Sequence, residues 1–315
     1  MGRVNSILRE IEIMADTNNQ KLRVTELDFD EIKDNLKTFL KNQSEFKDYD
    51  FEGSGMSILL DTLAYNTHYM GFNANMLANE MFLDSAALRS SVVSHAKTLG
   101  YEPSSCRAPK ATIGVALTTT NSTATMPAGT KFTSTVDGVS YQFVTITSRS
   151  ASSSGNTINF DNTEIYEGTY VTTKYTVDNS DTEQRFIITD NRADTTTLTV
   201  TVQNSSSDTF TTTYTKATDI SQLTINSNVY FLQEIEQGRF EVYFGDGVVS
   251  KSLTDGNIVI LQYVVTNKTA ANGANAFSSP SSISGITDIG ITLVAGASGG
   301  AEPESINSIK INAPL

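Results

Sequence analysis

The distribution of apolar residues along the chain changes near Pro109. Before this residue, apolar side chains recur at the three- and four-residue spacing of an amphipathic helix. After it, β-branched and aromatic residues alternate with polar ones between turns rich in Asn, Asp, Gly and Ser, as in TIGVALTTT, TLTVTVQ and FEVYFGDG. The sequence therefore predicts an α+β fold, with a helical, bundle-forming region of about three helices over residues 28–108 and a mainly antiparallel β domain over residues 109–298.

Two of the three predicted helices have the ordinary pattern of a single apolar stripe. The first begins at Asp28, which can cap it, and ends near Lys41. The third spans about residues 85–99, and Gly100 is placed to terminate it. Residues 1–27 are interpreted as an N-terminal extension.

The second helix, over about residues 55–83, has a heptad pattern that the other two lack. Its apolar residues alternate by four and three along two neighbouring seams. The first seam comprises Met56, Leu60, Leu63, Thr67, Met70, Ala74, Leu77 and Met81. The second seam comprises Ile58, Thr62, Tyr65, Tyr69, Phe72 and Met76. Gly71 costs about 1 kcal/mol in a helix interior, so we expect a kink or a close helix approach there.

The two seams make a wide part of the helix circumference apolar, more than two flanking helices of ordinary length can cover. Exposed apolar surfaces of this kind typically bind other proteins. The alternative is that the β domain folds back over the seams and makes them part of an internal core. We expect the seam residues to form an interface, and internal burial remains the other explanation.

The segment that leads into this helix combines acidic residues with glycine. The helix-entry motif consists of Asp48, Tyr49, Asp50, Phe51, Glu52, Gly53 and Ser54. Its first six residues match the first half of a calcium-binding EF-hand loop. The twelfth position of such a loop requires a bidentate Glu, but this chain has Leu59 there. The pattern therefore argues against a metal site. We expect the carboxylates to stabilise the helix N-terminus, with Ser54 as the N-cap residue.

The β domain contains a Thr- and Ser-rich insertion over about residues 133–228. Its strands can bury only one modest face, so we expect an exposed antiparallel subdomain, or one that a neighbour in an assembly orders. Two motifs predict tight turns. One is Pro127 with Gly129, and the other is the hairpin signal Gly245-Asp246-Gly247. These turns fix the backbone and carry no chemistry.

Charge and hydropathy exclude two classes of partner. The net charge is −13, and no run of Lys or Arg marks a basic surface for nucleic acid. Nowhere do about 18 apolar residues run together, so no membrane span is indicated. We expect neither nucleic acid nor a membrane as a partner.

The inventory of catalytic side chains is small. His68 and His95 are the only histidines and fall on predicted helices, and the single cysteine, Cys106, lies in a linker flanked by prolines. The chain contains no nucleophile elbow and no phosphate-binding loop motif. The sequence therefore predicts a protein that is not an enzyme and needs no cofactor, with Cys106 as a structural thiol.

Several segments occur in the order seen in a known family: DYDFEGSGMSILLDTLAYNT, LRSSVVSHAKTLGYEP, MPAGTKF, RFEVYFGDG, ANGANAFS and GGAEPESINSIKINAP. With them the chain resembles the baseplate J-like proteins, and most of all the wedge subunit of T-even-like contractile phages that is present in two copies per wedge. The resemblance extends from about Leu27 to Pro314, and its N-terminal block is the most specific part.

The resemblance implies a structural baseplate wedge protein of a phage tail. In that family, two copies pair with another wedge protein through a helical bundle. Neighbouring wedges join into a ring around the tail tube, and the ring rearranges when the sheath contracts. The implied partners are a second copy, other wedge proteins including a sheath-initiator-like subunit, and the neighbouring wedges. The implied location is the virion, after assembly in the host cytoplasm.

Family members continue beyond the segment that matches residues 299–315. We therefore expect this segment to begin a further part of a longer protein, or ring closure to be supplied by another subunit. The Thr- and Ser-rich strands also suggest a second class of function, a glycan- or receptor-binding β protein of the tail-fibre or adhesin type. Such proteins usually expose aromatic platforms, and this chain has no Trp.

Overall fold

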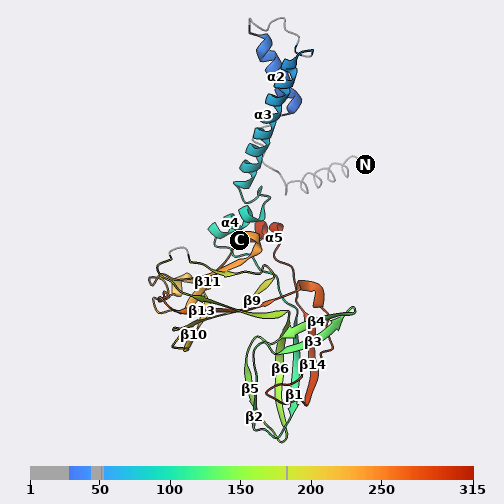
Figure 1. Cartoon of the computed structure of the whole chain (residues 1–315), viewed down its shortest axis with the longest axis vertical. Helices are drawn as coiled ribbons and strands as arrows, with labels where there is room; N and C mark the ends of the chain where they lie inside the picture. Colours follow the sequence, from blue (N-terminus) through green and yellow to red (C-terminus); the bar gives the residue numbers. More distant parts are fainter. Residues whose placement is uncertain (1–27, 44–50, 52, 182–183) are drawn as a thin grey trace, which may run out of the picture. The chain divides into compact units, whose positions relative to one another are not determined.

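The computed structural model describes residues 28–43, 51, 53–181 and 184–315. The chain divides into two compact units, whose elements are drawn in Figure 1. The helical unit comprises the described residues up to Tyr101 together with Ile306–Leu315, and the β unit comprises Glu102–Ser305. Helices therefore precede mainly antiparallel sheets, and the predicted α+β class is confirmed.

The helical unit is built from α2 (Phe29–Lys41), α3 (Gly55–Glu80), α4 (Arg89–Thr98) and α5 (Ile306–Asn312). The start of α2 is as predicted, because the Asp28 carboxylate accepts a hydrogen bond from the backbone N–H of Asp30 at 2.8 Å. The end of α4 is also as predicted. Gly100 has a φ of +78°, and the N–H of Tyr101 donates to the carbonyl of Ala96 at 2.9 Å.

The junction between α3 and α4 differs from the prediction. α3 ends at Glu80 rather than near residue 83, and α4 begins at Arg89 rather than at residue 85. The reason is local hydrogen bonding: the Glu80 carboxylate accepts from the backbone N–H groups of Ala87 and Leu88, which would otherwise lack partners at the start of α4. Sequence reasoning also missed α5, a short helix that packs on α4 through Ile309.

The β unit contains two large sheets and a small one. The five-stranded sheet has the order β14-β1-β6-β4-β3, with β1 Lys110–Thr118, β3 Lys131–Val136, β4 Val139–Val144, β6 Thr157–Glu167 and β14 Ile289–Ser298. A two-stranded sheet pairs β2 (Thr123–Met126) with β5 (Arg149–Ser152). The alternation predicted for TIGVALTTT is present in β1, where Ile113, Val115 and Leu117 are buried in one core.

The seven-stranded sheet has the order β7-β13-β9-β10-β11-β12-β8. Its strands are β7 Thr169–Thr176, β8 Phe186–Ile188, β9 Ala193–Gln203, β10 Thr211–Lys216, β11 Val229–Glu234, β12 Phe240–Phe244 and β13 Ile258–Val265. Among the strand pairings that the structure describes in this sheet, only the short β10–β11 pairing is parallel. A second core lies on this sheet and includes Val200, Leu232, Val242 and Leu261.

The Thr- and Ser-rich stretch does not form the separate subdomain that we expected. It supplies β4 and β6 to the five-stranded sheet and β7, β8, β9 and β10 to the seven-stranded one. In β9, Val200 and Val202 are buried because the strand lies between β13 and β10. A strand in which five of eleven residues are Thr can therefore be central to a sheet, since alternate positions still carry buried valines.

The chain passes from one large sheet to the other at Gly168, between β6 and β7. Its φ is +126°, and a Cβ there would lie 2.2 Å from the carbonyl oxygen of Val265. The preceding Glu167 is fully buried, and its carboxylate accepts hydrogen bonds from the Thr266 hydroxyl at 2.7 Å and from the Asn267 backbone N–H at 2.8 Å. This crossing point ties the end of β6 to the segment that follows β13.

Candidate assembly surface

The entry to α3 is only partly described by the structure. Ser54 occupies the N-cap position with extended backbone, but its side chain does not cap the helix. Its hydroxyl instead donates to the carbonyl of Phe51, whose ring is buried. Gly53 is exposed. The remaining members of the predicted entry motif lie outside the described residues: Asp48, Tyr49, Asp50 and Glu52.

The face of α3 that packs within the helical unit is a stripe of small and polar residues, which lies beside the two predicted seams. Its members also alternate by four and three, and they are buried or half-buried: Ser57, Asp61, Ala64, His68, Gly71, Asn75 and Ala78. α2 lies along α3 (Figure 1), and Lys33 of α2 forms an ion pair with Asp61 at 2.5 Å. Small side chains permit this close approach of two helices.

The two apolar seams are mostly exposed. Leu60 is only 2% exposed and belongs to the internal packing, and Met56 is half-buried. The other predicted interface residues are exposed large side chains: Leu63, Met70, Leu77, Met81, Ile58, Tyr65, Tyr69 and Phe72. Leu63 is 48% exposed and Ile58 is 71% exposed. Both seams therefore present apolar surface that the described residues leave open.

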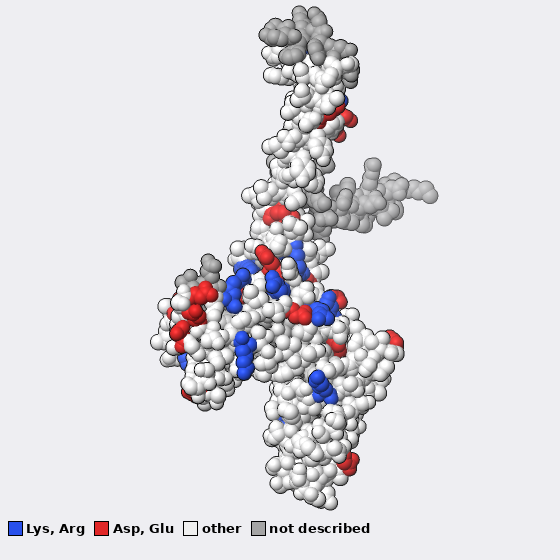
Figure 2. All heavy atoms as spheres, in the orientation of Figure 1, with Lys and Arg blue, Asp and Glu red and all other residues white. Residues whose placement is uncertain are grey.

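The polar groups on these seams leave the exposed surface apolar. The hydroxyl of Thr62 donates to the carbonyl of Ile58 at 2.8 Å, and that of Thr67 donates to Leu63 at 2.9 Å. Each hydroxyl is thus satisfied within the helix. Asp61 and Glu80 are the only charged residues of α3, and the α3 surface in Figure 2 is almost free of coloured atoms. Soluble proteins rarely leave so continuous an apolar surface exposed.

The far end of α3 is fixed to α4 and α5. His95 of α4 is hydrogen-bonded through Nε2 to the carbonyl of Glu80 at 2.8 Å. The ammonium of Lys310 in α5 donates to the carbonyl of Asp84 at 2.9 Å. Beneath these contacts lies an apolar cluster that includes Val92, Ala96 and Ile309. The C-terminal end of α3 and the connection that follows it are therefore held by α4 and α5.

The Pro127 motif forms a tight turn at a change of sheet. Gly129 has a φ of +81°, and its N–H donates to the carbonyl of Thr145 at 2.7 Å. The Thr130 hydroxyl donates to the carbonyl of Pro127 at 2.7 Å. The turn connects β2 and β3, which belong to different sheets.

The Gly245-Asp246-Gly247 motif forms a turn but no hairpin. β12 pairs with β11 and β8, whereas the next strand, β13, pairs with β7 and β9. The hairpin prediction is therefore wrong. Gly247 has a φ of +86°, and its N–H donates to the carbonyl of Ser250 at 3.0 Å. The chain folds back on itself there, and a Cβ at Gly245 would meet the Ser250 hydroxyl at 1.9 Å.

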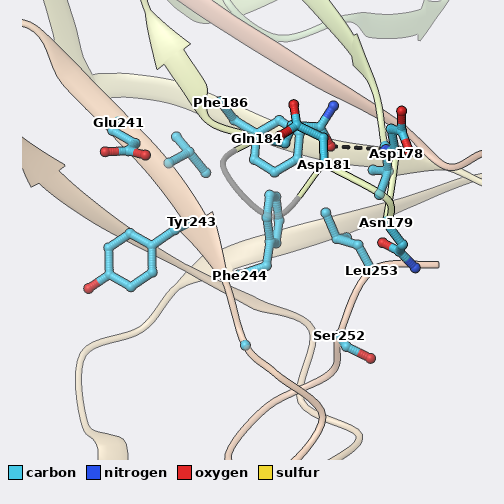
Figure 3. Close-up of a pocket in the computed structure, with 13 residues that line it drawn as sticks. Asp178, Asn179, Asp181, Gln184, Phe186, Glu241, Tyr243, Phe244, Ser252 and Leu253 are labelled. Carbon is cyan, nitrogen blue, oxygen red and sulfur yellow. Dashed lines mark hydrogen bonds between the residues drawn. The ribbon is translucent and has the colours of Figure 1, made fainter. Parts of the chain in front are cut away.

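A pocket of about 350 Å³ lies against one end of β12 (Figure 3). Phe186, Phe244 and Leu253 line it together with the carboxylates of Asp178 and Glu241. Hydrogen bonds from Ser180 hold the pKa of Asp178 below its ordinary value, and Arg185 Nε donates to Glu241 at 2.8 Å. Both carboxylates thus already accept hydrogen bonds from neighbouring side chains.

The thiol of Cys106 is placed for structure. It is fully buried, and its Sγ–H donates to the carbonyl of Ala193 at 3.4 Å. Burial and the nearby charge of Asp194 raise its pKa to about 12. A thiol with so high a pKa is a poor nucleophile at neutral pH.

The described residues contain neither a metal centre nor a membrane-spanning helix. Among them, no group of His, Cys, Asp and Glu side chains is arranged to hold a metal ion. Within the same part of the chain, no helix is both long and apolar enough to cross a membrane. Because eight predicted interface residues are exposed large side chains, the seams of α3 are the strongest candidate for a functional surface.

Comparison with known proteins relates both units to the tails of bacteriophages. Residues 28–101, which contain α2, α3 and α4, match the helical domain of gp6-like baseplate wedge proteins. Residues 169–274, which contain every strand of the seven-stranded sheet, match the third domain of bacteriophage baseplate wedge protein gp6. These matches support membership of a baseplate wedge protein family.

A relative within this family extends the likeness along nearly the whole chain. Baseplate wedge protein gp6 of Enterobacteria phage T4 is 31% identical over 309 residues, and the match covers 90% of this chain. It covers 46% of the T4 protein, so the chain spans about half the length of that relative. The strands β1 to β6 and β14 lie outside both matched domains, although the T4 relative covers most of the chain.

Proposed function

We propose that the chain is a structural subunit of the baseplate wedge in a contractile-tailed phage, of the baseplate J-like type. The two apolar seams of α3 would bind a second copy of the chain and helices of other wedge proteins. One observation carries the proposal: the helix that matches the gp6-like helical domain leaves two heptad seams exposed. The domain matches favour this role over glycan or receptor binding.

The physical mechanism is burial of these seams in a helical bundle. Heptad spacing keeps a seam facing its partner along the helix, and each large apolar side chain taken out of water contributes roughly 1.5–3 kcal/mol before the costs of association. Eight of the predicted interface residues are exposed, among them Met70 at 64%. Such an interface resembles a domain core divided between chains, as in obligate complexes.

Further partners follow from the same role. We expect a sheath-initiator-like subunit within the wedge and the neighbouring wedges around the tail tube. The protein would be located in the virion baseplate, after assembly in the host cytoplasm. The ring would rearrange when the sheath contracts, and the chain would have no enzymatic activity or cofactor in this process.

The test uses the full chain with two seam residues changed. Leu63→Asp combined with Met70→Asp places two charges on the first seam, seven residues apart. The matched control, Asn66→Asp with Asn73→Asp, adds the same charges at the same spacing on exposed positions that belong to neither seam. Both proteins are co-expressed with a tagged second copy and the other wedge proteins, and helix content is checked by circular dichroism.

We expect the seam variant to lose at least about tenfold in captured partners, because two desolvated carboxylates cannot be compensated in an apolar bundle. The control should capture partners as the wild type does. If the seam variant assembles normally, or if it loses its helices while the control keeps them, the seams are internal core and the proposal fails.

A further inference from the structure

The edges of the two large sheets are unequal. β8 has three residues, and β7 carries Lys174. β3 is partly covered, because Thr133 and Ser278 exchange backbone hydrogen bonds at 3.2 and 2.8 Å. Short length, an edge lysine and a covering segment are the usual ways in which proteins prevent edge-to-edge pairing. Three of the four edges are thus protected.

β14 has none of these protections. It lies outside β1 in the five-stranded sheet (Figure 1) and contains no charged residue and no proline over ten residues. Leu293 and Val294 on it are exposed. Within the described part of the chain, no strand pairs with its outer side. A long, uncharged edge of this kind is a template for another strand.

The register with β1 shows which backbone groups this edge offers. The Thr118 N–H donates to the carbonyl of Asp288, and pairing then continues without a shift from Leu117 opposite Ile289 to Ile113 opposite Leu293. In an antiparallel ladder, alternate residues direct both N–H and C=O to the same neighbour. Asp288, Gly290 and Thr292 therefore direct their N–H and C=O groups to β1. The N–H and C=O groups of Ile289, Ile291 and Leu293 face outward.

Both ends of this open ladder are fixed. Beyond Leu293 the register with β1 shifts, which marks a bulge around Val294. Further along, the outer side of Ala297 is occupied, because Gly273 donates to its carbonyl and its own N–H donates to Ala274. The open part of the edge thus runs from Ile289 to Leu293 and is centred on Ile291.

We propose that the β14 edge pairs antiparallel with β14 of a second copy, with Ile291 on the twofold axis. In this register Ile291 faces its own equivalent, and Ile289 faces Leu293 of the partner. Each residue whose N–H and C=O face outward then lies opposite another such residue. The free backbone groups of the two copies can therefore hydrogen-bond to one another. The absence of charge on β14 removes the repulsion that self-pairing of a charged strand would cause.

A ladder of this length buries far less than the roughly 1,600 Å² of a standard interface. It therefore adds to an assembly that other contacts hold together, and alone it gives only weak dimers. The inference concerns a surface separate from α3 and relies on the proposed function only for the presence of several copies.

The experiment uses the full chain carrying Leu63→Asp and Met70→Asp, so that association through α3 is removed. Ile291→Cys is introduced into this background and the protein is oxidised. Hydrogen-bonded antiparallel pairs have Cα atoms about 5.5 Å apart, within the range of a disulfide. The matched control is Val248→Cys, an exposed valine in the turn after β12, and the native Cys106 is buried.

We expect a disulfide-linked dimer from Ile291→Cys and none from Val248→Cys. Adding Leu293→Lys should lower the yield about tenfold, because an edge lysine blocks pairing, whereas adding Val248→Lys should not. The proposal is overturned by equal yields from both cysteines, or by a yield that Leu293→Lys leaves unchanged. None of these results depends on the α3 seams, so they are separable from failure of the proposed function.

Discussion

The carboxylate of Glu80, the last residue of α3, accepts a hydrogen bond from the backbone N–H of Ala87 at 2.8 Å. The N–H of Leu88 donates to the same oxygen at 3.2 Å. One helix thus caps the next with its final side chain, while His95 of the second helix binds the Glu80 carbonyl in return. This reciprocal contact links the end of α3 to the start of α4.

Replacing Glu80 by Ala should lower the free energy of unfolding of the helical unit by about 1 kcal/mol, the usual value of a lost cap. The measurement is denaturant unfolding followed by circular dichroism at neutral pH. Asp84→Ala is the control, because its exposed carboxylate lies in the same connection and only its backbone carbonyl receives Lys310. Equal losses from both variants would mean that the cap contributes nothing.

The Glu80 contribution should also depend on pH. Burial raises the Glu80 pKa, but hydrogen bonds from Ser91, Ala87 and Leu88 and the charge of Lys310 outweigh it and hold the pKa below 4.5. A lowered folded-state pKa gives stability that is present above the unfolded value and is lost as the pH falls through the folded one. The difference between wild type and Glu80→Ala should therefore shrink below pH 4.5, and a difference that grows there would contradict this cause.

The packed stripe of α3 should be sensitive to side-chain size. Ala64 is fully buried on this stripe, so Ala64→Leu forces extra volume into the helical unit and should cost about 1–3 kcal/mol of unfolding free energy. Ala74→Leu makes the same change at an exposed position of the helix and should leave the stability of the isolated chain almost unchanged. Thermal unfolding measures the stability of both variants. An equal loss of stability from the two substitutions would mean that the packed face lies elsewhere on α3.

The crossing between the two large sheets should depend on one buried carboxylate. Glu167→Ala leaves the Thr266 hydroxyl and the Asn267 N–H without their acceptor and should cost about 3 kcal/mol. Glu164 lies on the same strand as Glu167 and forms an exposed ion pair with Lys110 of β1, so Glu164→Ala should cost less than about 1 kcal/mol. Urea unfolding of the full chain measures both, and a reversed order would contradict the assignment.

Local patterns predicted the helices well because capping and heptad spacing act over a few residues. They did not indicate which side of α3 packs internally. Small residues such as Ala64 and Gly71 add little to a hydrophobic pattern, yet they allow the close packing that buries this stripe. The sequence predicted the seams as a candidate surface. Whether a seam residue is covered depends on long-range contacts that only the structure shows. In the structure the Leu63 side chain is exposed, whereas the Leu60 side chain is buried.

The β unit shows where local signals end. The turn at Gly247 forms as its glycine suggests, but strand pairing is a long-range property, and β13 pairs with β7 and β9 rather than with β12. The same limit explains why α5 was missed. This helix is held by Ile309, which packs against α4, and α4 is distant from it in sequence.

Oxidation of methionine tests the central claim directly, that partners cover the exposed seams of α3. Met70, Met76 and Met81 are exposed on the seams, whereas Met126 is fully buried in the β unit and provides an internal reference. In the free chain, peroxide should oxidise the three seam methionines rapidly and spare Met126, since exposure governs this reaction. In assembled wedges or baseplates, the account predicts that oxidation of the three seam methionines slows on the order of tenfold or more. Unchanged oxidation of all three in the assembly would contradict it.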